Sequence, residues 1–242
     1  MPDIQRHLID AGAAVELFMA KPAGHPKGAM LFVHGNQGGT LLGAREMVDN
    51  GTLANLRDRV GIVAASVSQP GFGASEGPAD FCGPRTQQAI HAALGFLRDA
   101  LADADDPVVL YGISRGAVAS GMVAAEDADL AALILVAGSY DLAATYRQAS
   151  PGLRSVIERE AGLGDSDFSA RSPLRHAHRI MADTLLVHGR QDDRAPFEQA
   201  EQMATALRKA GTSVSLTACD CGHRIPRDVS RAALRPFLAR IF

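Results

Sequence analysis

The sequence predicts an α/β protein built on a mostly parallel β-sheet with helices on both faces, arranged in three layers. Short runs of almost purely apolar residues alternate along the chain with stretches whose apolar residues recur at helical spacing. This alternation is typical of strands buried on both faces and of the helices that cover them. Most of the apolar runs also end in a loop that carries polar residues, as expected at the carboxyl edge of a parallel sheet.

Length and composition predict one ordinary globular domain over residues 1–242. The chain is 47% hydrophobic and 21% charged, with a formal net charge of −3, and this length supports a full core. The charges form no block of one sign, so we expect neither nucleic acid nor a membrane surface as a partner. The start of the chain lacks the pattern of a signal peptide, and three cysteines favour a reducing cytoplasm over a disulfide framework. The oligomeric state is left open.

The first hundred residues are predicted to contain four strands and two helices. A hairpin around Gly12 comes first, and two buried strands follow it. Pro84 opens a helix, because proline is favoured at the first helical position. The expected segments are strands at 3–9, 13–20, 29–33 and 61–67, a helix over 41–58 that Gly51 interrupts, and a helix from Pro84 to about Leu101.

The second half continues the alternation. Strands are predicted at 108–111, 130–137, 184–187 and 214–218, with helices after Ser114, from Pro196 to Gly211, and from about Pro226 to the end. Pro236 should kink the last helix. Residues 142–183 contain no strand pattern, and we expect one or two short helices there, around 150–161 and 173–180. Leu153, Val156 and Ile157 are apolar residues of this segment.

The candidate nucleophile is Ser114. The apolar run before it leads into Gly112-Ile113-Ser114-Arg115-Gly116, a match to G-x-S-x-G, and a helical pattern of small residues follows. A strand, a sharp turn and a helix in this order place a serine hydroxyl clear of the backbone. The helix that begins at Arg115 directs unpaired N–H groups towards the serine, where an oxyanion is stabilised.

A serine hydroxyl needs a general base, and His223 is the best candidate. It is the only one of eight histidines that follows the last predicted strand. Cys219 and Cys221 precede it at a spacing too short for a zinc site, and no second ligand pair occurs elsewhere, so we expect small apolar cysteines and no metal. The glycines after residue 69 match neither nucleotide-binding fingerprint, and no cofactor is expected.

With these loops in place, the chain resembles the α/β-hydrolase superfamily from His34-Gly35 to the last helix. Ser172-Pro173-Leu174 and the later segment TLLVHGRQDDRAP resemble the catalytic domain of prolyl-oligopeptidase-type serine hydrolases and of dienelactone-hydrolase-type esterases. Two departures from the pattern occur. Ala117 stands where the family usually has a second glycine after the elbow, and Ser68 replaces an acidic residue that often precedes the glycine-rich loop.

The resemblance implies a triad of Ser114, Asp192 and His223. The family pattern H-G-x-x-D-x-x-V-P selects Asp192 as the acid that orients the histidine, while Asp193 and Asp141 remain alternatives. It also implies an oxyanion hole made by the backbone N–H groups of Asn36 and Arg115. The family inserts caps between the strands predicted at 130–137 and 184–187, so the resemblance further implies that residues 142–183 form a small lid, with Leu153, Val156 and Ile157 lining an apolar acyl pocket or packing on the sheet. His34 and His188 are expected to be structural residues at strand ends.

We therefore expect a serine hydrolase that cleaves small carboxylic esters through an acyl-enzyme, without cofactor or metal. One alternative is a serine peptidase or aminopeptidase of the prolyl-oligopeptidase type, and another is a non-enzymatic binding protein with the same fold. A peptidase should hold a carboxylate near the site to grip a substrate amine, and Glu76 and Glu158 are the only candidates. A binding protein usually lacks a triad member. The preference among ester, amide and thioester is left open.

Overall fold

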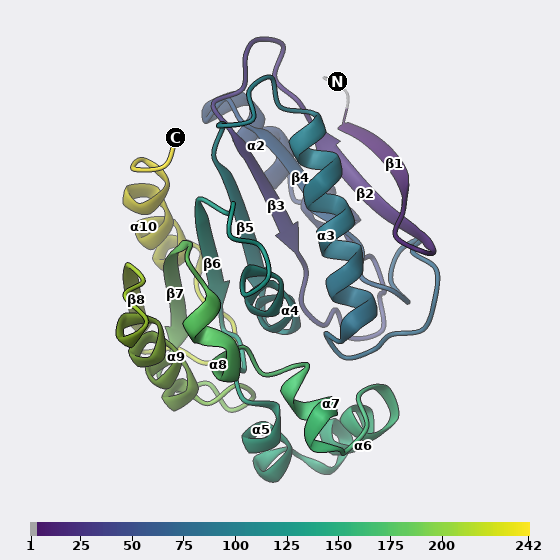
Figure 1. The fold of residues 1–242 in the computed structure, drawn as a ribbon, viewed down its shortest axis with the longest axis vertical. Coiled ribbons are helices and arrows are strands. Elements are labelled where there is room, and N and C mark those ends of the chain that lie inside the picture. Colours follow the sequence, from purple (N-terminus) through teal and green to yellow (C-terminus); the bar gives the residue numbers. More distant parts are fainter. Residues whose placement is uncertain (1–3) are drawn as a thin grey trace.

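A computed structural model describes residues 4–242 and arranges eight strands in one sheet (Figure 1). The strand order is β1-β2-β4-β3-β5-β6-β7-β8, and β2 runs antiparallel to both of its neighbours while the pairs from β4 to β8 are parallel. The strands are β1 Ile4–Asp10, β2 Ala14–Ala20, β3 Ala29–Val33, β4 Val63–Val67, β5 Val108–Ile113, β6 Ala132–Val136, β7 Asp183–Gly189 and β8 Val214–Cys219.

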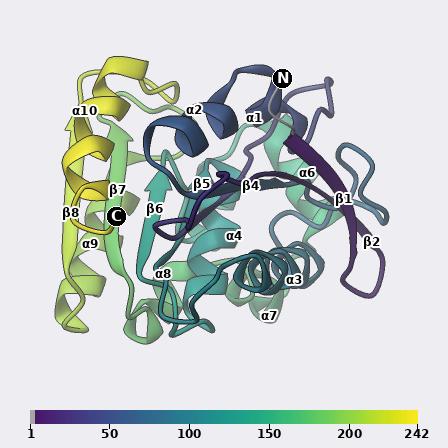
Figure 2. The same cartoon turned by 90° about the horizontal axis from the view of Figure 1, so that it is seen from above.

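Helices cover both faces of the sheet, as Figure 2 shows from above. One face carries α1 Arg45–Asp49, α2 Thr52–Arg59 and α10 Arg227–Leu238, and the other carries α3 Pro84–Asp99, α4 Arg115–Ala124, α8 Pro173–His176 and α9 Phe197–Lys209. The predicted three-layer α/β architecture is therefore confirmed. Within residues 4–242, every helix is too short or too polar to cross a membrane.

The apolar runs of the central strands form two separate core layers. Leu31, Leu110 and Leu133 pair in register across β3, β5 and β6 and belong to the layer under α3 and α4. Their neighbours Val109 and Ile134 point to the opposite face, under α2 and α10. Because successive residues of a strand alternate between faces, a strand covered on both sides must be apolar throughout.

The connection between β6 and β7 holds more helix than the one or two segments predicted. Besides α8 it contains α5 Leu142–Gln148, α6 Pro151–Glu160, α7 Asp165–Ser169 and a 3₁₀ turn, η1 Ala177–Arg179. The first three lie beyond the carboxyl ends of the strands (Figure 1). Side chains cap the N-termini of α5 and α6. Asp141 accepts a hydrogen bond from the Ala144 N–H and Ser150 accepts one from the Leu153 N–H, which is the usual role of an N-cap.

The predicted helix over 41–58 is wrong in its first part. Leu41 and Gly43 have positive φ angles of 49° and 59°, so this stretch turns, and the first helix begins only at Arg45. Gly51, at φ 75°, then separates α1 from α2 as expected. Asp3, where the predicted hairpin begins, lies outside the described residues, and Pro236 falls in the last turn of α10.

Close packing of α4 on β3 gives a first prediction. A Cβ atom on Gly116 would lie 2.1 Å from the carbonyl oxygen of Val33, whereas a Cβ on Gly152 in α6 would meet nothing within 4 Å. Gly116→Ala should therefore lower the free energy of unfolding by at least ~2 kcal/mol, because backbone must move. Gly152→Ala should leave it unchanged or raise it by up to ~1 kcal/mol, since alanine favours helix.

Urea denaturation followed by circular dichroism measures both variants. Equal stability of the two variants would show that α4 and β3 do not need this close approach.

Candidate active site

Ser114 lies between the last residue of β5 and the first residue of α4. Its backbone angles are φ 54° and ψ −117°, a conformation that costs a non-glycine residue roughly 1–3 kcal/mol. Glycines surround this turn. A Cβ on Gly112 would approach the Gly116 oxygen to 2.3 Å, and a Cβ on Gly35 would lie 3.0 Å from the Ser114 Cβ. The sharp turn thus depends on small residues on two loops.

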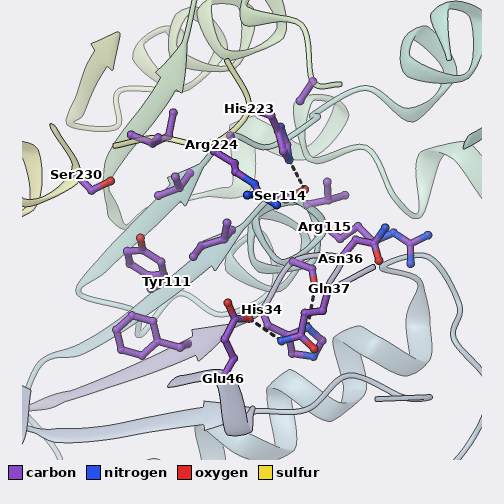
Figure 3. Close-up of a pocket in the computed structure, with 18 of the residues that line it drawn as sticks. His34, Asn36, Gln37, Glu46, Tyr111, Ser114, Arg115, His223, Arg224 and Ser230 are labelled. Atoms are coloured by element: carbon purple, nitrogen blue, oxygen red, sulfur yellow. Dashed lines mark hydrogen bonds between the residues drawn. The ribbon is translucent and has the colours of Figure 1, made fainter. Parts of the chain in front are cut away.

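The structure brings the three residues of the expected triad into one hydrogen-bonded chain (Figure 3). His223 Nε2 lies 3.0 Å from Ser114 Oγ. On the other side of the ring, His223 Nδ1 lies 2.9 Å from Asp192 Oδ2 and 3.1 Å from Oδ1. A carboxylate only accepts hydrogen bonds, so Nδ1 carries the proton and Nε2 is free to accept one from the serine.

Asp192 is buried and accepts hydrogen bonds from four directions. The Arg194 and Ala195 backbone N–H groups each donate to Oδ1 at 2.9 Å. His188 Nε2 lies 3.3 Å from Oδ2 and 2.7 Å from the Ala195 carbonyl oxygen. Burial alone would raise the pKa of Asp192, but the hydrogen bonds from the two histidines and two amides outweigh it and hold the pKa well below its usual range.

Two loops meet to bring the acid to the histidine. Arg190 N donates to the Cys219 carbonyl at 2.8 Å, and Gln191 N donates to the Cys221 carbonyl at 3.0 Å. Gly189 is required here, because a Cβ would lie 2.3 Å from the Cys221 oxygen. The two cysteines are joined by a disulfide, so the expectation of separate apolar cysteines is wrong. The described residues contain no group of three potential ligands placed to hold a metal.

The two alternative acids lie elsewhere. Asp193 is exposed and forms no hydrogen bond with His223 in the part of the chain that the structure describes. Asp141 caps α5, where its carboxylate accepts from the Ala144 N–H at 3.0 Å. The carboxylate that contacts the histidine is therefore that of Asp192, the residue that the family pattern selects.

The two expected oxyanion donors border the same cleft as Ser114. Arg115 is the first residue of α4, so its N–H has no partner within the helix. Asn36 follows the His34-Gly35 pair after β3, and its side chain accepts from the Gly38 N–H at 3.2 Å. Among residues 4–242, the backbone N–H groups of Asn36 and Arg115 donate to no other group of the protein.

His34 connects two loops at the edge of the site. Its Nε2 accepts from the Gln69 N–H at 3.1 Å, so its Nδ1 carries the proton that is donated to the Gly35 carbonyl at 2.8 Å. Burial lowers the pKa of this ring. His34 is therefore a neutral residue that holds the loops after β3 and β4 together, in keeping with its expected structural role.

A buried carboxylate that the sequence did not point to organises the glycine-rich loop. Glu16 on β2 accepts from Ser68 Oγ at 3.0 Å, from the Ala74 N–H at 3.1 Å and from Arg6 Nε at 2.7 Å. Burial would raise the pKa of Glu16, but these hydrogen bonds lower it overall. The Ser68 hydroxyl in turn accepts from the Ala44 N–H at 2.8 Å. A neighbouring strand thus supplies the acid that is missing at position 68.

The side chain of Arg115 has a role of its own. It forms an ion pair of 3.1 Å with Glu160 at the end of α6, and both side chains are only 12–13% exposed. Its guanidinium also lies over the Phe81 ring, 4.2 Å from the ring centre, a favourable cation–π distance. This contact could not be predicted, because Arg115 and Glu160 are far apart along the chain.

Cys82 lies close to the site but is not a second nucleophile. Its thiol is buried and lies 3.2 Å from the Arg115 carbonyl oxygen. Burial raises the pKa of this thiol to about 12, so it stays protonated at neutral pH, and only the thiolate is nucleophilic.

The low pKa of Asp192 predicts a pH-dependent contribution to stability. The unfolded chain takes up a proton at an ordinary carboxyl pKa while the folded chain does not, so this contribution is present above about pH 4 and is lost as the pH falls below it. Asp192→Asn should lower the free energy of unfolding by roughly 1–3 kcal/mol at pH 6 and by less at pH 3.5. Urea denaturation at both pH values measures the difference.

The neighbouring Asp193→Asn serves as the matched control and should change the free energy of unfolding little at either pH. A deficit of Asp192→Asn that is the same at both pH values would contradict the assignment of the stabilising hydrogen bonds to the ionised carboxylate.

Comparison with known proteins shows the family and the fold of this chain. The model of the prolyl oligopeptidase family (Peptidase_S9) matches residues 85–238, well over half of the chain. A segment of 46 residues is 48% identical to an uncharacterized peptidase, YuxL, of Bacillus subtilis; it is 19% of this chain and 7% of that protein.

Solved structures share the fold over nearly the whole chain at low identity. The acylaminoacyl peptidase of Pyrococcus horikoshii superposes with a TM-score of 0.77 and 21% identity, covering 99% of this chain and 41% of that one. A puromycin hydrolase superposes with a TM-score of 0.79 and 18% identity, covering 100% of this chain and 39% of that one. An esterase of Pyrococcus furiosus superposes with a TM-score of 0.76 and 15% identity, covering 98% of this chain and 91% of that one. This chain has the α/β-hydrolase fold and belongs to the prolyl oligopeptidase family of serine hydrolases.

Proposed function

We propose that the protein hydrolyses carboxylic esters through a covalent acyl-enzyme on Ser114. The observation that carries the proposal is the unbroken chain from Ser114 Oγ through both nitrogens of His223 to the Asp192 carboxylate, with neighbouring atoms 2.9–3.0 Å apart. This is the arrangement in which an imidazole accepts the serine proton while a carboxylate fixes its tautomer.

In the proposed reaction, Ser114 Oγ attacks the ester carbonyl carbon as its proton passes to His223 Nε2. The imidazolium that forms is stabilised by the Asp192 carboxylate, which remains ionised. The tetrahedral oxyanion accepts hydrogen bonds from the free N–H groups of Arg115 and Asn36. Collapse releases the alcohol, which takes the proton from His223. Water then repeats the sequence on the acyl-enzyme, so the products are one carboxylic acid and one alcohol.

We also propose that residues 142–183 act as a small lid over this site. Leu142, Leu153 and Val156 line the cleft that contains Ser114, which supports the expected apolar lining. Ile157, the third candidate, is buried in the core instead. The ion pair between Arg115 and Glu160 ties the lid to the residue after the nucleophile.

A small ester is favoured over a peptide because the two candidate carboxylates for gripping an amine are engaged elsewhere. Glu76 accepts from the Ala14 N–H at 3.1 Å, and Glu158 accepts from the Tyr146 hydroxyl at 2.6 Å; neither lines the cleft. Peptidase activity remains the second candidate, since the matching family is that of prolyl oligopeptidase and the acylaminoacyl peptidase of Pyrococcus horikoshii shares the fold. A purely binding function is disfavoured by the complete triad. The cytoplasmic location stays a prediction.

Replacing the nucleophile gives the direct test of the mechanism. Ser114→Ala should reduce kcat for p-nitrophenyl acetate by at least ~10⁴-fold, because nothing else in the triad can form the acyl-enzyme. It should also abolish labelling by a fluorophosphonate probe. The control is Asp193→Asn, which should retain both. Equal labelling of wild type and Ser114→Ala would overturn the proposal.

Substrate class is tested separately with matched leaving groups. We expect p-nitrophenyl esters of short acids to be hydrolysed with a kcat/KM at least ~10²-fold above that for aminoacyl p-nitroanilides, since neither Glu76 nor Glu158 lines the cleft to hold the free amine. A higher kcat/KM for the anilides would replace the esterase assignment with a peptidase one and leave the triad untouched.

A further inference from the structure

The cleft at Ser114 extends far beyond the triad. Its volume is about 2430 Å³, whereas pockets for small molecules commonly measure roughly 300–1,000 Å³. It contains Ser114 and His223, and its lining also includes Lys27, which precedes β3, and Phe242 at the end of the chain. The cleft therefore runs along one face of the sheet, on the side where Figure 2 shows α2 and α10.

The floor of this groove is apolar. Phe32, Tyr111 and Val136 contribute from three neighbouring strands, and Leu234 and Leu238 contribute from α10. Figure 3 shows Tyr111 and Ser230 further along the pocket from Ser114, with Arg224 beside the reacting residues. An aliphatic chain that starts at the serine thus has a continuous hydrocarbon surface to lie on.

The side chains that line the groove carry a net positive charge, whereas the whole chain carries a net negative charge. The chain has a net charge of −3, yet eight basic side chains line the cleft against two acidic ones, Glu46 and Asp193. Glu46 is already engaged, since Gln37 donates to it at 2.6 Å. The groove therefore attracts negatively charged groups.

Four of the basic residues lie on one side of the groove at spacings of three or four residues, namely Arg224, Arg227, Arg231 and Arg235. All four are exposed. Within the described chain none of them has a carboxylate within salt-bridge distance, whereas Arg240 on the same side of the molecule pairs with Asp183 at 3.0 Å. Their guanidinium groups are thus free to bind an anion, which arginine does in a bidentate manner.

We propose that the groove binds a negatively charged amphiphilic ester, with its aliphatic chain on the apolar floor and its anionic group on the arginines of α10. This inference rests on the proposed hydrolysis at Ser114, which fixes the position of the carbonyl. From Arg227 to Arg235 the helix rises about 12 Å. An arginine therefore lies within reach of the carboxylate or phosphate for esters with aliphatic chains of different lengths. The groove thereby selects medium-chain esters that carry a terminal negative charge.

Two substrates that differ only in charge test the selection. One is the mono-p-nitrophenyl ester of sebacic acid, which carries a free carboxylate, and the other is its methyl ester, which is neutral. We expect wild type to prefer the charged substrate. The double variant Arg231→Gln/Arg235→Gln should lower the ratio of the two kcat/KM values by about five- to tenfold, and added salt should lower it in the same direction.

Arg208→Gln is the matched control, because Arg208 is an exposed arginine on α9 that does not line the cleft. It should leave the ratio unchanged. An unchanged ratio in the double variant, or an equal fall in the control, overturns the inference while leaving hydrolysis at Ser114 intact.

A binding measurement separates this inference from the proposed reaction. Calorimetry on Ser114→Ala, which cannot turn over, compares decyl phosphate with decyl maltoside below their micelle concentrations. We expect tighter binding of decyl phosphate and a five- to tenfold loss of that binding when Arg231 and Arg235 are also replaced. This result would support the groove even if the protein hydrolysed no ester.

Sedimentation with phosphatidylglycerol vesicles identifies a competing occupant. Arginine-dependent binding to vesicles without binding of monomeric decyl phosphate would assign this face to a membrane surface and overturn the inference. Binding of decyl phosphate without vesicle binding supports it.

Discussion

Ser114 holds a strained backbone conformation, and the packing that enforces it also brings the loop of the second expected oxyanion donor against the nucleophile. The turn forms because α4 lies against β3 so closely that Gly116 touches the main chain of Val33. The same approach brings the His34-Gly35 loop against the serine. Strain of this kind persists only where the surroundings over-determine it, and here two glycine loops and a buried helix do so.

Most of the fold could be predicted because its signals are local. Each central strand is covered on both faces, so it appears in the sequence as an unbroken apolar run. The helices of residues 142–183, the proposed lid, have no comparable signal in the sequence. Helices such as α5 and α7 are short and begin at capping residues or glycine, and one or two turns are too few for apolar periodicity to be visible.

In the candidate site, too, the features with a local sequence signal could be predicted and the others could not. Ser114 and His223 could be predicted because each follows a recognisable strand, whereas Asp192 is selected over Asp193 and Asp141 by the family pattern. The contacts of Arg115 with Glu160 and of Glu16 with Ser68 could not, because they join residues that are 45 and 52 positions apart and depend on how two elements pack. Ser68 also shows that a local departure from a family pattern can be offset by a residue on an adjacent strand.

Arg115 belongs to two parts of the molecule at once. Its backbone N–H faces the reacting carbonyl in the proposed mechanism, and its side chain is tied to the last turn of α6. The proposed lid is consequently not a module that can be exchanged freely among relatives. A transplanted lid without an acidic residue at position 160 leaves a nearly buried guanidinium uncompensated next to the nucleophile, and that burial is costly. Changes in substrate range that arise by remodelling α6 are therefore expected to alter turnover as well, so that specificity and rate evolve together in this protein.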